Sequence, residues 1–365
     1  MFSLSGALIK ERTFSLADSY RHVDLSLSSY MERCTLALEC TIASPRKSST
    51  WLGFWVVAAL SRYTSGSPFI FWDRAGTSCL TAANISFLLP SMLPNLCKGQ
   101  KYNVFFINLL NMNKTVLITG ATSGIGKACA VRFAQGGYDI ILTGRSREKV
   151  SETEKEILSL CPNIETYPLI FDVRDKDAAQ KAILSLPEDW ADIDVLVNNA
   201  GLALGLDPEY EGDIDDWETM IDTNIKGLLY MTRLVVPGMV RRNKGHIINI
   251  GSVAGDAAYA NGNVYCATKA AVKALSDGLR IDLAHTPLRV TNIKPGLVET
   301  NFSNTRFHGD NARADKVYRG IKPLSGADIA DVAFYAASAP AHVQIAEVLV
   351  LATHQASGSV IFREE

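Results

Sequence analysis

The chain has 365 residues, with 36 lysines and arginines against 38 aspartates and glutamates. This near-neutral balance gives no electrostatic reason to expect a nucleic acid as partner. The composition, 47% hydrophobic and 20% charged, is typical of a globular protein. The longest apolar run, from Trp51 to Leu60, is about half of the roughly 20 residues that a membrane helix needs. We therefore expect neither a nucleic-acid-binding nor a membrane-spanning protein.

The seven cysteines form no C-x-x-C pair and no Cys/His cluster with metal-ligand spacing. Cys129 and Cys266 fall inside predicted helices, and Cys161 precedes Pro162. Small buried thiols of this kind favour a reducing compartment, the cytoplasm, and no metal site.

Residues 1–111 differ in composition from the rest of the chain. They are rich in Ser and Leu and show no sustained period of 3.6 or 2 residues. Glu11 and Arg12 interrupt any early apolar core of a secretory signal, and further acidic residues contradict a mitochondrial presequence. We predict an irregular extension, either disordered or absent from a native protein that starts at Met112, followed by one folded domain over residues 112–365.

From Lys114 onward, short apolar runs alternate with helical patterns. Helices are predicted at 126–135 and 147–160. Strands are predicted at 115–119, 140–143, 165–171, 194–199, 246–250, 288–293 and 347–351. Short β-rich runs separated by helices of ten or more residues indicate parallel βαβ units. The sequence therefore predicts an α/β fold, a single Rossmann-like doubly wound domain with a seven-stranded parallel sheet.

A glycine-rich turn follows the first of these strands. The segment TGATSGIG contains Gly120, Gly124 and Gly126 and leads into a helix. Glycines allow the backbone to approach a pyrophosphate, and the helix N-terminus offers free N–H groups and a favourable dipole. The string alone is a weak signal, but its place at the first βα turn is the one that a dinucleotide site requires.

The end of the second strand indicates which nicotinamide nucleotide is bound. An NAD-preferring enzyme usually carries a carboxylate there for the ribose 2′-OH, whereas this strand ends in TGRSR with no carboxylate. A guanidinium can pair with the 2′-phosphate of NADP. We predict NADP as cofactor, with Arg145 and Ser146 at the 2′-phosphate. The alternative is that Arg145 and Arg147 are solvated loop charges.

Tyr265 and Lys269 lie four residues apart, on one face of a predicted helix. A phenol with a pKa of about 10 is a poor base at neutral pH, but a nearby ammonium and an oxidised nicotinamide ring favour the phenolate. Ser252, just beyond the end of a strand, can hydrogen-bond a substrate oxygen. Asn224 is a polar residue within an otherwise apolar helix, and an amide that only bends the helix is the alternative for it.

With these motifs in order, residues 112–365 resemble the short-chain dehydrogenase/reductase superfamily. The matching segments are TGATSGIG, FDV (171–173), NNAG (198–201), Asn224, Ser252, the Tyr265–Lys269 pair and PGLVET (295–300). The resemblance implies that Tyr265 is the general acid/base, that Ser252 polarises the substrate oxygen, and that Lys269 binds the nicotinamide ribose and lowers the pKa of Tyr265. Asn224 would hold a water of a proton relay. The implied cofactor contacts are those of the glycine turn (Gly120, Thr122, Ser123, Gly124, Ile125 and Gly126), Asp172 and Val173 near adenine, Asn199 and Ala200 near its ribose, and Val298 and Thr300 near the nicotinamide.

Longer segments are similar to one branch of this superfamily, the NADP-dependent 3-hydroxy acid dehydrogenases that act on serine, allo-threonine and related short acids. They include LVNNAGLALG (196–205), DDWETMIDTN (215–224) and FSNTRFHGD (302–310). A small acid needs a cationic partner for its carboxylate, and the loop after Pro295 and Gly296 contains Arg306 and His308. We predict Arg306 as the carboxylate anchor; the alternative is an arginine of the surface or of a subunit contact.

Two other functions remain as alternatives. The first is a reductase of the same superfamily for a ketone, a sugar or an acyl thioester, because fold and catalytic residues do not fix the substrate. The second is a non-catalytic cofactor sensor, which would usually have lost Tyr265 or Lys269. By resemblance we also expect a homo-oligomer, a tetramer joined through the helices that carry Asn224 and Tyr265.

Overall fold

The structure, a computed structural model, describes residues 71–72, 79–80 and 113–364. The chain divides into two units, Met1–Leu110 and Asn111–Glu365. In the first unit, β1 (Phe71–Trp72) pairs antiparallel with β2 (Cys79–Leu80). The remainder of the predicted extension, including the apolar run from Trp51 to Leu60, lies outside the described residues.

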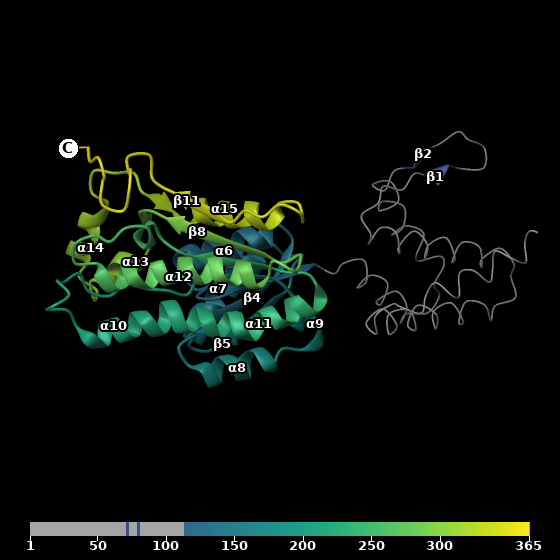
Figure 1. Ribbon diagram of the computed structural model, residues 1–365. Coiled ribbons are helices and arrows are strands. Elements are labelled where there is room, and N and C mark those ends of the chain that lie inside the picture. The colour runs from purple at the N-terminus through teal and green to yellow at the C-terminus, as the bar shows by residue number, and fades with distance from the viewer. Residues whose placement is uncertain (1–70, 73–78, 81–112, 365) are drawn as a thin grey trace, which may run out of the picture. The chain divides into compact units, whose positions relative to one another are not determined.

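The second unit contains one parallel sheet of seven strands in the order β11-β8-β7-β6-β3-β4-β5, which confirms the predicted α/β fold (Figure 1). Its five inner strands are nearly continuous runs of buried residues, as expected for a sheet covered on both faces, whereas the edge strands β11 and β5 are mostly half-buried or exposed. The strand order reverses between β3 and β6, where a doubly wound sheet leaves a crevice. The strands are β3 (Lys114–Ile118), β4 (Tyr138–Gly144), β5 (Thr166–Ile170), β6 (Ile193–Asn198), β7 (His246–Ile250), β8 (Arg289–Pro295) and β11 (Glu347–Val350).

Helices cover both faces of this sheet and bury two separate apolar cores. One core packs Phe133 of α6 (Gly124–Gln135) and Ile157 of α7 (Arg147–Leu160) against the sheet, together with α15 (Gly326–Ser338). The other packs Met231 of α11 (Leu228–Arg242) and Leu283, at the end of α12 (Asn263–Asp282), together with α8 (Lys176–Leu184). The short helices are α9 (Glu188–Ala191), α10 (Ile214–Ile221), α13 (Phe302–Arg306) and α14 (Asn311–Tyr318).

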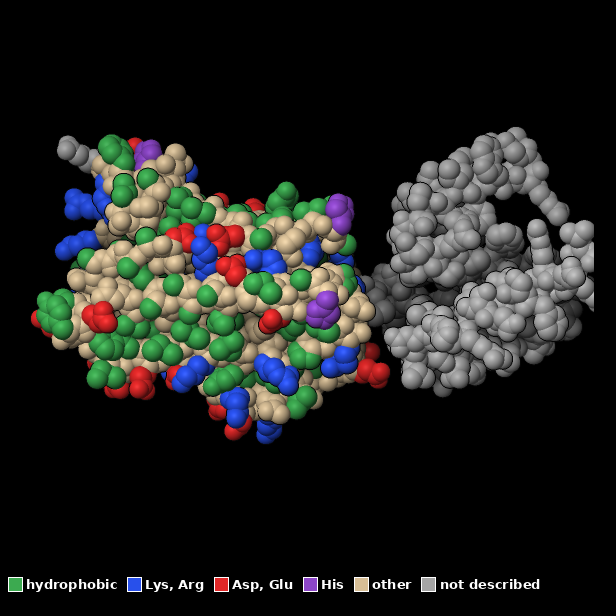
Figure 2. Space-filling view, in the orientation of Figure 1, with side chains coloured by type: hydrophobic (Ala, Val, Ile, Leu, Met, Phe, Trp, Pro, Cys, Tyr) green, Lys and Arg blue, Asp and Glu red, His purple; other side chains and the backbone are tan. Residues whose placement is uncertain are grey.

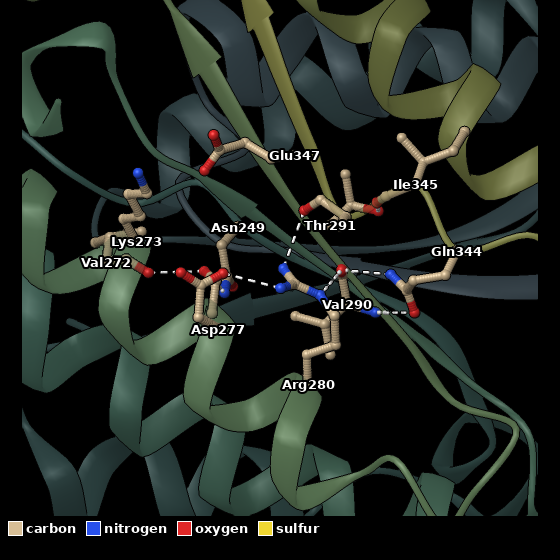
Figure 3. A network of polar contacts seen from close by, with 12 residues as sticks. Asn249, Val272, Lys273, Asp277, Arg280, Val290, Thr291, Gln344, Ile345 and Glu347 are labelled. Carbon is tan, nitrogen blue, oxygen red and sulfur yellow. Dashed lines mark hydrogen bonds and ion pairs between the residues drawn. The ribbon is translucent and has the colours of Figure 1, made fainter.

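The C-terminal end of α12 is fixed to the edge of the sheet by a network of polar contacts (Figure 3). Arg280 donates to the carbonyl of Val290 on β8 at 3.3 Å and to that of Ala346, just before β11, at 3.0 Å, and it pairs with Asp277 at 2.8 Å. These bonds fix the helix that carries Tyr265 and Lys269 relative to the strands.

Most strand bounds shift by one or two residues from the prediction, and two further differences concern the site. Helix α6 begins two residues earlier, at Gly124, because the backbone N–H of Lys127 already donates to the carbonyl of Ser123. Asn224, predicted within a regular helix, lies in a π-helical turn, Asp222–Gly227, between α10 and α11. A π turn adds a residue to the turn and changes which side chains face inward.

Candidate active site

The predicted site residues gather at the carboxyl ends of the central strands. The glycine turn follows β3, Asn199 follows β6, Ser252 follows β7, and the segment with Val298 and Thr300 follows β8. Ligands of open α/β sheets bind at this edge, beside the reversal of strand order.

The backbone of the glycine turn requires its glycines. Gly120 has φ of 65°, a left-handed conformation that favours glycine. A Cβ on Gly126 would collide with the carbonyl of Gly120 and the side-chain amide of Asn199. The side of the turn at Gly126 is therefore packed against Gly120 and Asn199, with no room for a side chain.

The first turn of α6 is suited to an anion. Its N-cap residue Ser123 makes no side-chain cap, whereas Ser146, Asp175 and Asp213 cap α7, α8 and α10 with their side chains. No acidic residue stands in this turn. Uncapped N–H groups and the helix dipole fit the pyrophosphate of a dinucleotide. Ile125 packs against the apolar core with a half-buried side chain.

Asn199 contacts the protein itself. Its side-chain amide donates to the carbonyls of Thr119 at 2.8 Å and Gly120 at 3.2 Å, and its backbone N–H donates to the Thr119 hydroxyl at 2.9 Å. In this structure Asn199 therefore holds the glycine turn in place beneath the predicted adenine ribose.

Arg145 extends from the end of β4 with 66% of its side chain exposed, and its guanidinium lies 3.8 Å from the Asp172 carboxylate. Asp172 pairs more closely with Arg174, at 2.8 Å. Burial acts to raise the pKa of Asp172, but the bonds from Arg174 outweigh it, and the pKa is lowered. Ser146 caps α7 and donates its hydroxyl proton to Glu148 at 2.8 Å. Arg174 is paired with the Asp172 carboxylate, so the exposed guanidinium of Arg145 is the cation here that a 2′-phosphate could bind.

The segment after β8 folds back over the glycine turn. Val298 belongs to β9 (Val298–Glu299), which pairs in parallel with β10 (Leu324–Ser325), and its carbonyl accepts from the Tyr318 hydroxyl at 3.0 Å. Thr300 lies so close to the turn that a Cβ on Gly124 would be 3.3 Å from its side chain.

Tyr265 and Lys269 are both buried on α12, with Lys269 Nζ 5.9 Å from the centre of the Tyr265 ring. Nζ donates to the carbonyl of Ile250 at 2.9 Å, and burial lowers the pKa of Lys269 to about 8. Burial and the neighbouring Tyr259 raise the pKa of Tyr265, and a hydrogen bond with Ser252 and the charge of Arg306 oppose this rise. With the protein's own groups alone, Tyr265 is therefore a neutral phenol.

Asn224 is held in a fixed orientation by three hydrogen bonds. Its Oδ1 accepts from the Leu202 N–H at 2.9 Å, while its Nδ2 donates to the Leu202 carbonyl at 2.8 Å and to the Thr268 hydroxyl at 3.0 Å. A Cβ on Gly201 would lie 3.2 Å from Asn224 Oδ1 and 3.5 Å from Lys269 Nζ. The glycine thus leaves open the space that Asn224 and Lys269 share.

Lys294, which the sequence analysis did not single out, supports the loop that carries Ser252. Its buried ammonium pairs with Asp256, just after this loop, at 2.8 Å and with Glu347 of β11 at 2.5 Å. Burial acts to lower the pKa of Lys294, but these carboxylates raise it overall. No motif indicated this residue, because its two partners come from distant parts of the chain.

Tyr265 and Arg306, the residue predicted as the carboxylate anchor, line one pocket. The guanidinium of Arg306 donates to the carbonyl of Gly205 at 3.1 Å and to the hydroxyl of Tyr259 at 2.8 Å, and its carbon lies 5.7 Å from the centre of the Tyr265 ring. His308 does not line this pocket, but its Nε2 hydrogen-bonds with Asp216, which does, at 2.9 Å. Tyr259 and Asp216 are further site residues that the sequence analysis missed.

A glycine turn at the reversal of a parallel sheet, with a buried tyrosine and lysine beside it, is the arrangement of a nucleotide-dependent oxidoreductase. Residues 114–311 match the family model for short chain dehydrogenase, and the chain belongs to this family. It is an oxidoreductase of this family, in line with the function predicted above.

Individual relatives resemble the chain closely. It is 52% identical over 241 residues to the NADP-dependent 3-hydroxy acid dehydrogenase YdfG of Salmonella typhi, which covers 66% of this chain and 95% of that protein. It is 45% identical over 253 residues to the NADP-dependent 3-hydroxy acid dehydrogenase of Schizosaccharomyces pombe, covering 69% and 97%. A solved structure of the closed form of serine dehydrogenase complexed with NADP+ has 47% identity and a TM-score of 0.64, covering 69% of this chain and 100% of that one.

Proposed function

We propose that this chain is an NADP-dependent dehydrogenase that interconverts a short 3-hydroxy acid and its 3-oxo acid. L-serine, L-allo-threonine and 3-hydroxypropionate represent the substrate class. The relatives named above support this proposal, but the observation that carries it is the place of Arg306. Arg306 is the one basic residue among the described residues that line this pocket, whose other charged residues are Asp207, Glu209, Asp213 and Asp216. Its guanidinium carbon lies 5.7 Å from the centre of the Tyr265 ring, so a short molecule can place its carboxylate at Arg306 and its hydroxyl at Tyr265.

The residues that would hold NADP follow from the site. The amides of the glycine turn and of the α6 N-terminus, including Thr122 and Ser123, would bind the pyrophosphate. Arg145 and Ser146 would bind the 2′-phosphate, and Asp172 and Val173 would lie at the adenine. Val298 and Thr300 would lie at the nicotinamide end. When bound, NADP supplies hydride exchange with C3 of the substrate.

The chain's own residues would handle the proton. Tyr265 takes the proton of the 3-hydroxyl as C3 is oxidised, and returns it in the reverse direction. Ser252 orients the same oxygen. The positive charge of Arg306 favours the phenolate of Tyr265, against the burial that favours the phenol. The ammonium of Lys269, 5.9 Å from the ring centre, would act in the same direction. Asn224, fixed by Leu202 and Thr268, lies beside Lys269 and would hold the water that connects it to solvent.

The test is a panel of L-serine, L-allo-threonine, 3-hydroxypropionate and 3-hydroxyisobutyrate with NADP+ and NAD+. We expect turnover of at least one of these acids with NADP+ and a lower kcat/KM with NAD+. Tyr265→Phe should nearly abolish turnover and leave the affinity for NADPH unchanged. Activity restricted to neutral ketones, sugars or acyl thioesters would overturn the substrate class, and an inactive protein that still binds NADPH would indicate a cofactor sensor.

The predicted homotetramer is a separate proposal. Exposed apolar side chains lie on α11 and α12, among them Leu229 and Ile281, and Figure 2 shows hydrophobic side chains spread over this face. Burial of such a face between copies would stabilise an assembly. Light scattering of the purified protein would measure the state, and Ile281→Glu should shift it toward smaller species. We also propose that the enzyme works in the cytoplasm, where its buried thiols stay reduced.

A further inference from the structure

The Arg306 side chain is fixed by a residue from the turn that precedes the catalytic helix. Tyr259 lies three residues before Gly262, the N-cap of α12, and its carbonyl accepts from the Gly262 N–H at 3.1 Å. Its ring packs directly on Gly262, where a Cβ would overlap the ring. The position of the Tyr259 ring is therefore coupled to the start of α12 and, three residues further on, to Tyr265.

The hydroxyl and the ring of Tyr259 both contact Arg306. The hydroxyl accepts from Nη1 at 2.8 Å, and the guanidinium carbon lies 5.4 Å from the ring centre. Nε donates to the Gly205 carbonyl at 3.1 Å. A planar guanidinium with two donors fixed in this way has one orientation, and its remaining donors stay available to a carboxylate.

We propose that Tyr259 is a specificity-determining positioning residue, which holds Arg306 so that a bound carboxylate places its 3-hydroxyl at Tyr265. This inference rests on the proposed function. The half-buried Arg306 side chain has several rotatable bonds. Without the Tyr259 hydroxyl the side chain would populate several conformations, and binding of the carboxylate would cost the conformational entropy of restricting it to one. Fixing the cation beforehand therefore lowers KM for an acid and has no effect on a substrate without a carboxylate.

Tyr259→Phe tests the inference because it removes the hydroxyl and keeps the ring on Gly262. The substrates are 3-hydroxypropionate and its methyl ester, which share the reacting carbon and differ in charge. We expect KM for the acid to rise roughly tenfold, the value of one lost hydrogen bond to a charged group. We expect kcat for the acid, both constants for the ester and the affinity for NADPH to stay within about twofold.

Tyr318→Phe is the matched control. Tyr318 ends α14, in the same segment between β8 and α15 as Arg306, and its hydroxyl bonds to Ser303 and to the carbonyl of Val298 instead of to Arg306. Loosening of the loop alone would change KM for acid and ester alike. In an Arg306→Met background, Tyr259→Phe should have no further effect on KM for the acid.

An unchanged KM for the acid in Tyr259→Phe, or an equal rise for acid and ester, would overturn the inference. Its failure is distinguishable from failure of the proposed function. If the wild-type enzyme oxidises no short 3-hydroxy acid, the proposed function is wrong. If the wild-type enzyme oxidises such an acid and Tyr259→Phe has the same KM for it, only the role of Tyr259 is wrong.

Discussion

Replacement of Lys269 by methionine should make the protein more stable while it removes the activity. Lys269 is buried, and burial lowers its pKa from 10.5 to about 8. This lowering corresponds to about 3 kcal/mol by which the charged side chain destabilises the fold. Methionine has a similar length and no charge. The bond to the Ile250 carbonyl is lost, and a buried acceptor left without a donor costs roughly 1 to 3 kcal/mol.

The net gain expected for Lys269→Met is therefore about 0 to 2 kcal/mol at neutral pH, or a rise in Tm of up to about 8 °C for a domain of this size. The gain should depend on pH. The unfolded chain holds more protons than the folded one between pH 8 and 10.5, so the wild type gains stability as the pH rises through this range. Below pH 8 its destabilisation is complete, and above pH 10.5 it is absent.

Differential scanning calorimetry of both proteins without cofactor, at pH 7 and pH 10, would measure this difference. Lys273→Met, one turn further along α12, is the control, because Lys273 is 40% exposed and pairs only loosely with Asp256, at 3.5 Å. It should change Tm little at either pH. A Lys269→Met protein that is less stable than the wild type at pH 7, or a difference that does not shrink toward pH 10, would refute the reasoning.

The remaining predictions concern the two arginines assigned to ligand binding, Arg306 and Arg145, and the stability of the protein at acid pH. Arg306→Met should lower kcat/KM for 3-hydroxypropionate at least about 30-fold and that for the methyl ester much less, because only the acid loses the partner of its carboxylate, while both substrates lose the charge that favours the Tyr265 phenolate. Arg145→Ala should lower kcat/KM with NADP+ about tenfold, the low end for a charged hydrogen bond because the side chain is largely exposed, and leave that with NAD+ nearly unchanged. The third concerns His246, whose pKa is lowered by burial and by Arg289 to about 3. The free energy of unfolding should therefore fall by about 1.4 kcal/mol per pH unit below pH 6.5, and His246→Gln should reduce this slope.

Each of these has a matched comparison. Arg313→Met changes a second arginine of the same loop, one that lies over Phe307 outside the pocket, and should leave kcat/KM for the acid unchanged. An equal loss with acid and ester in Arg306→Met would remove the assigned anchor. Equal losses with both nucleotides in Arg145→Ala would make Arg145 a surface charge. Urea unfolding between pH 4 and 8 measures the slope, and an identical slope in His246→Gln would locate the titrating group elsewhere.

The regular part of the fold was predictable because it depends on local patterns. Helix α7 and strand β7 have the bounds that the sequence indicated, since a charged amphipathic repeat and a continuous β-rich run each determine an element by themselves. The π turn at Asn224 was not predictable, because the apolar pattern of α10 and α11 continues through it without a break.

The predicted site residues are brought to one edge of the sheet, and their roles stay predictions. What the sequence could not reveal are contacts between segments far apart in the chain. Tyr259 and Arg306 are 47 residues apart, and Lys294 and Glu347 are 53 apart. No short motif contains both partners of such a pair, so only the three-dimensional arrangement identifies them.

The residues of the pocket come from two parts of the fold that differ in how well they tolerate substitution. Tyr265 and Lys269 belong to α12, a 20-residue helix fixed to the sheet, whereas Arg306 ends α13, a five-residue helix in the segment between β8 and α15. Insertions and exchanges are tolerated best in such connecting segments. Exchange of residues 302–310 could therefore redirect the enzyme to uncharged or longer alcohols with its chemical machinery intact. This makes the segment the natural region for randomisation in a directed-evolution library.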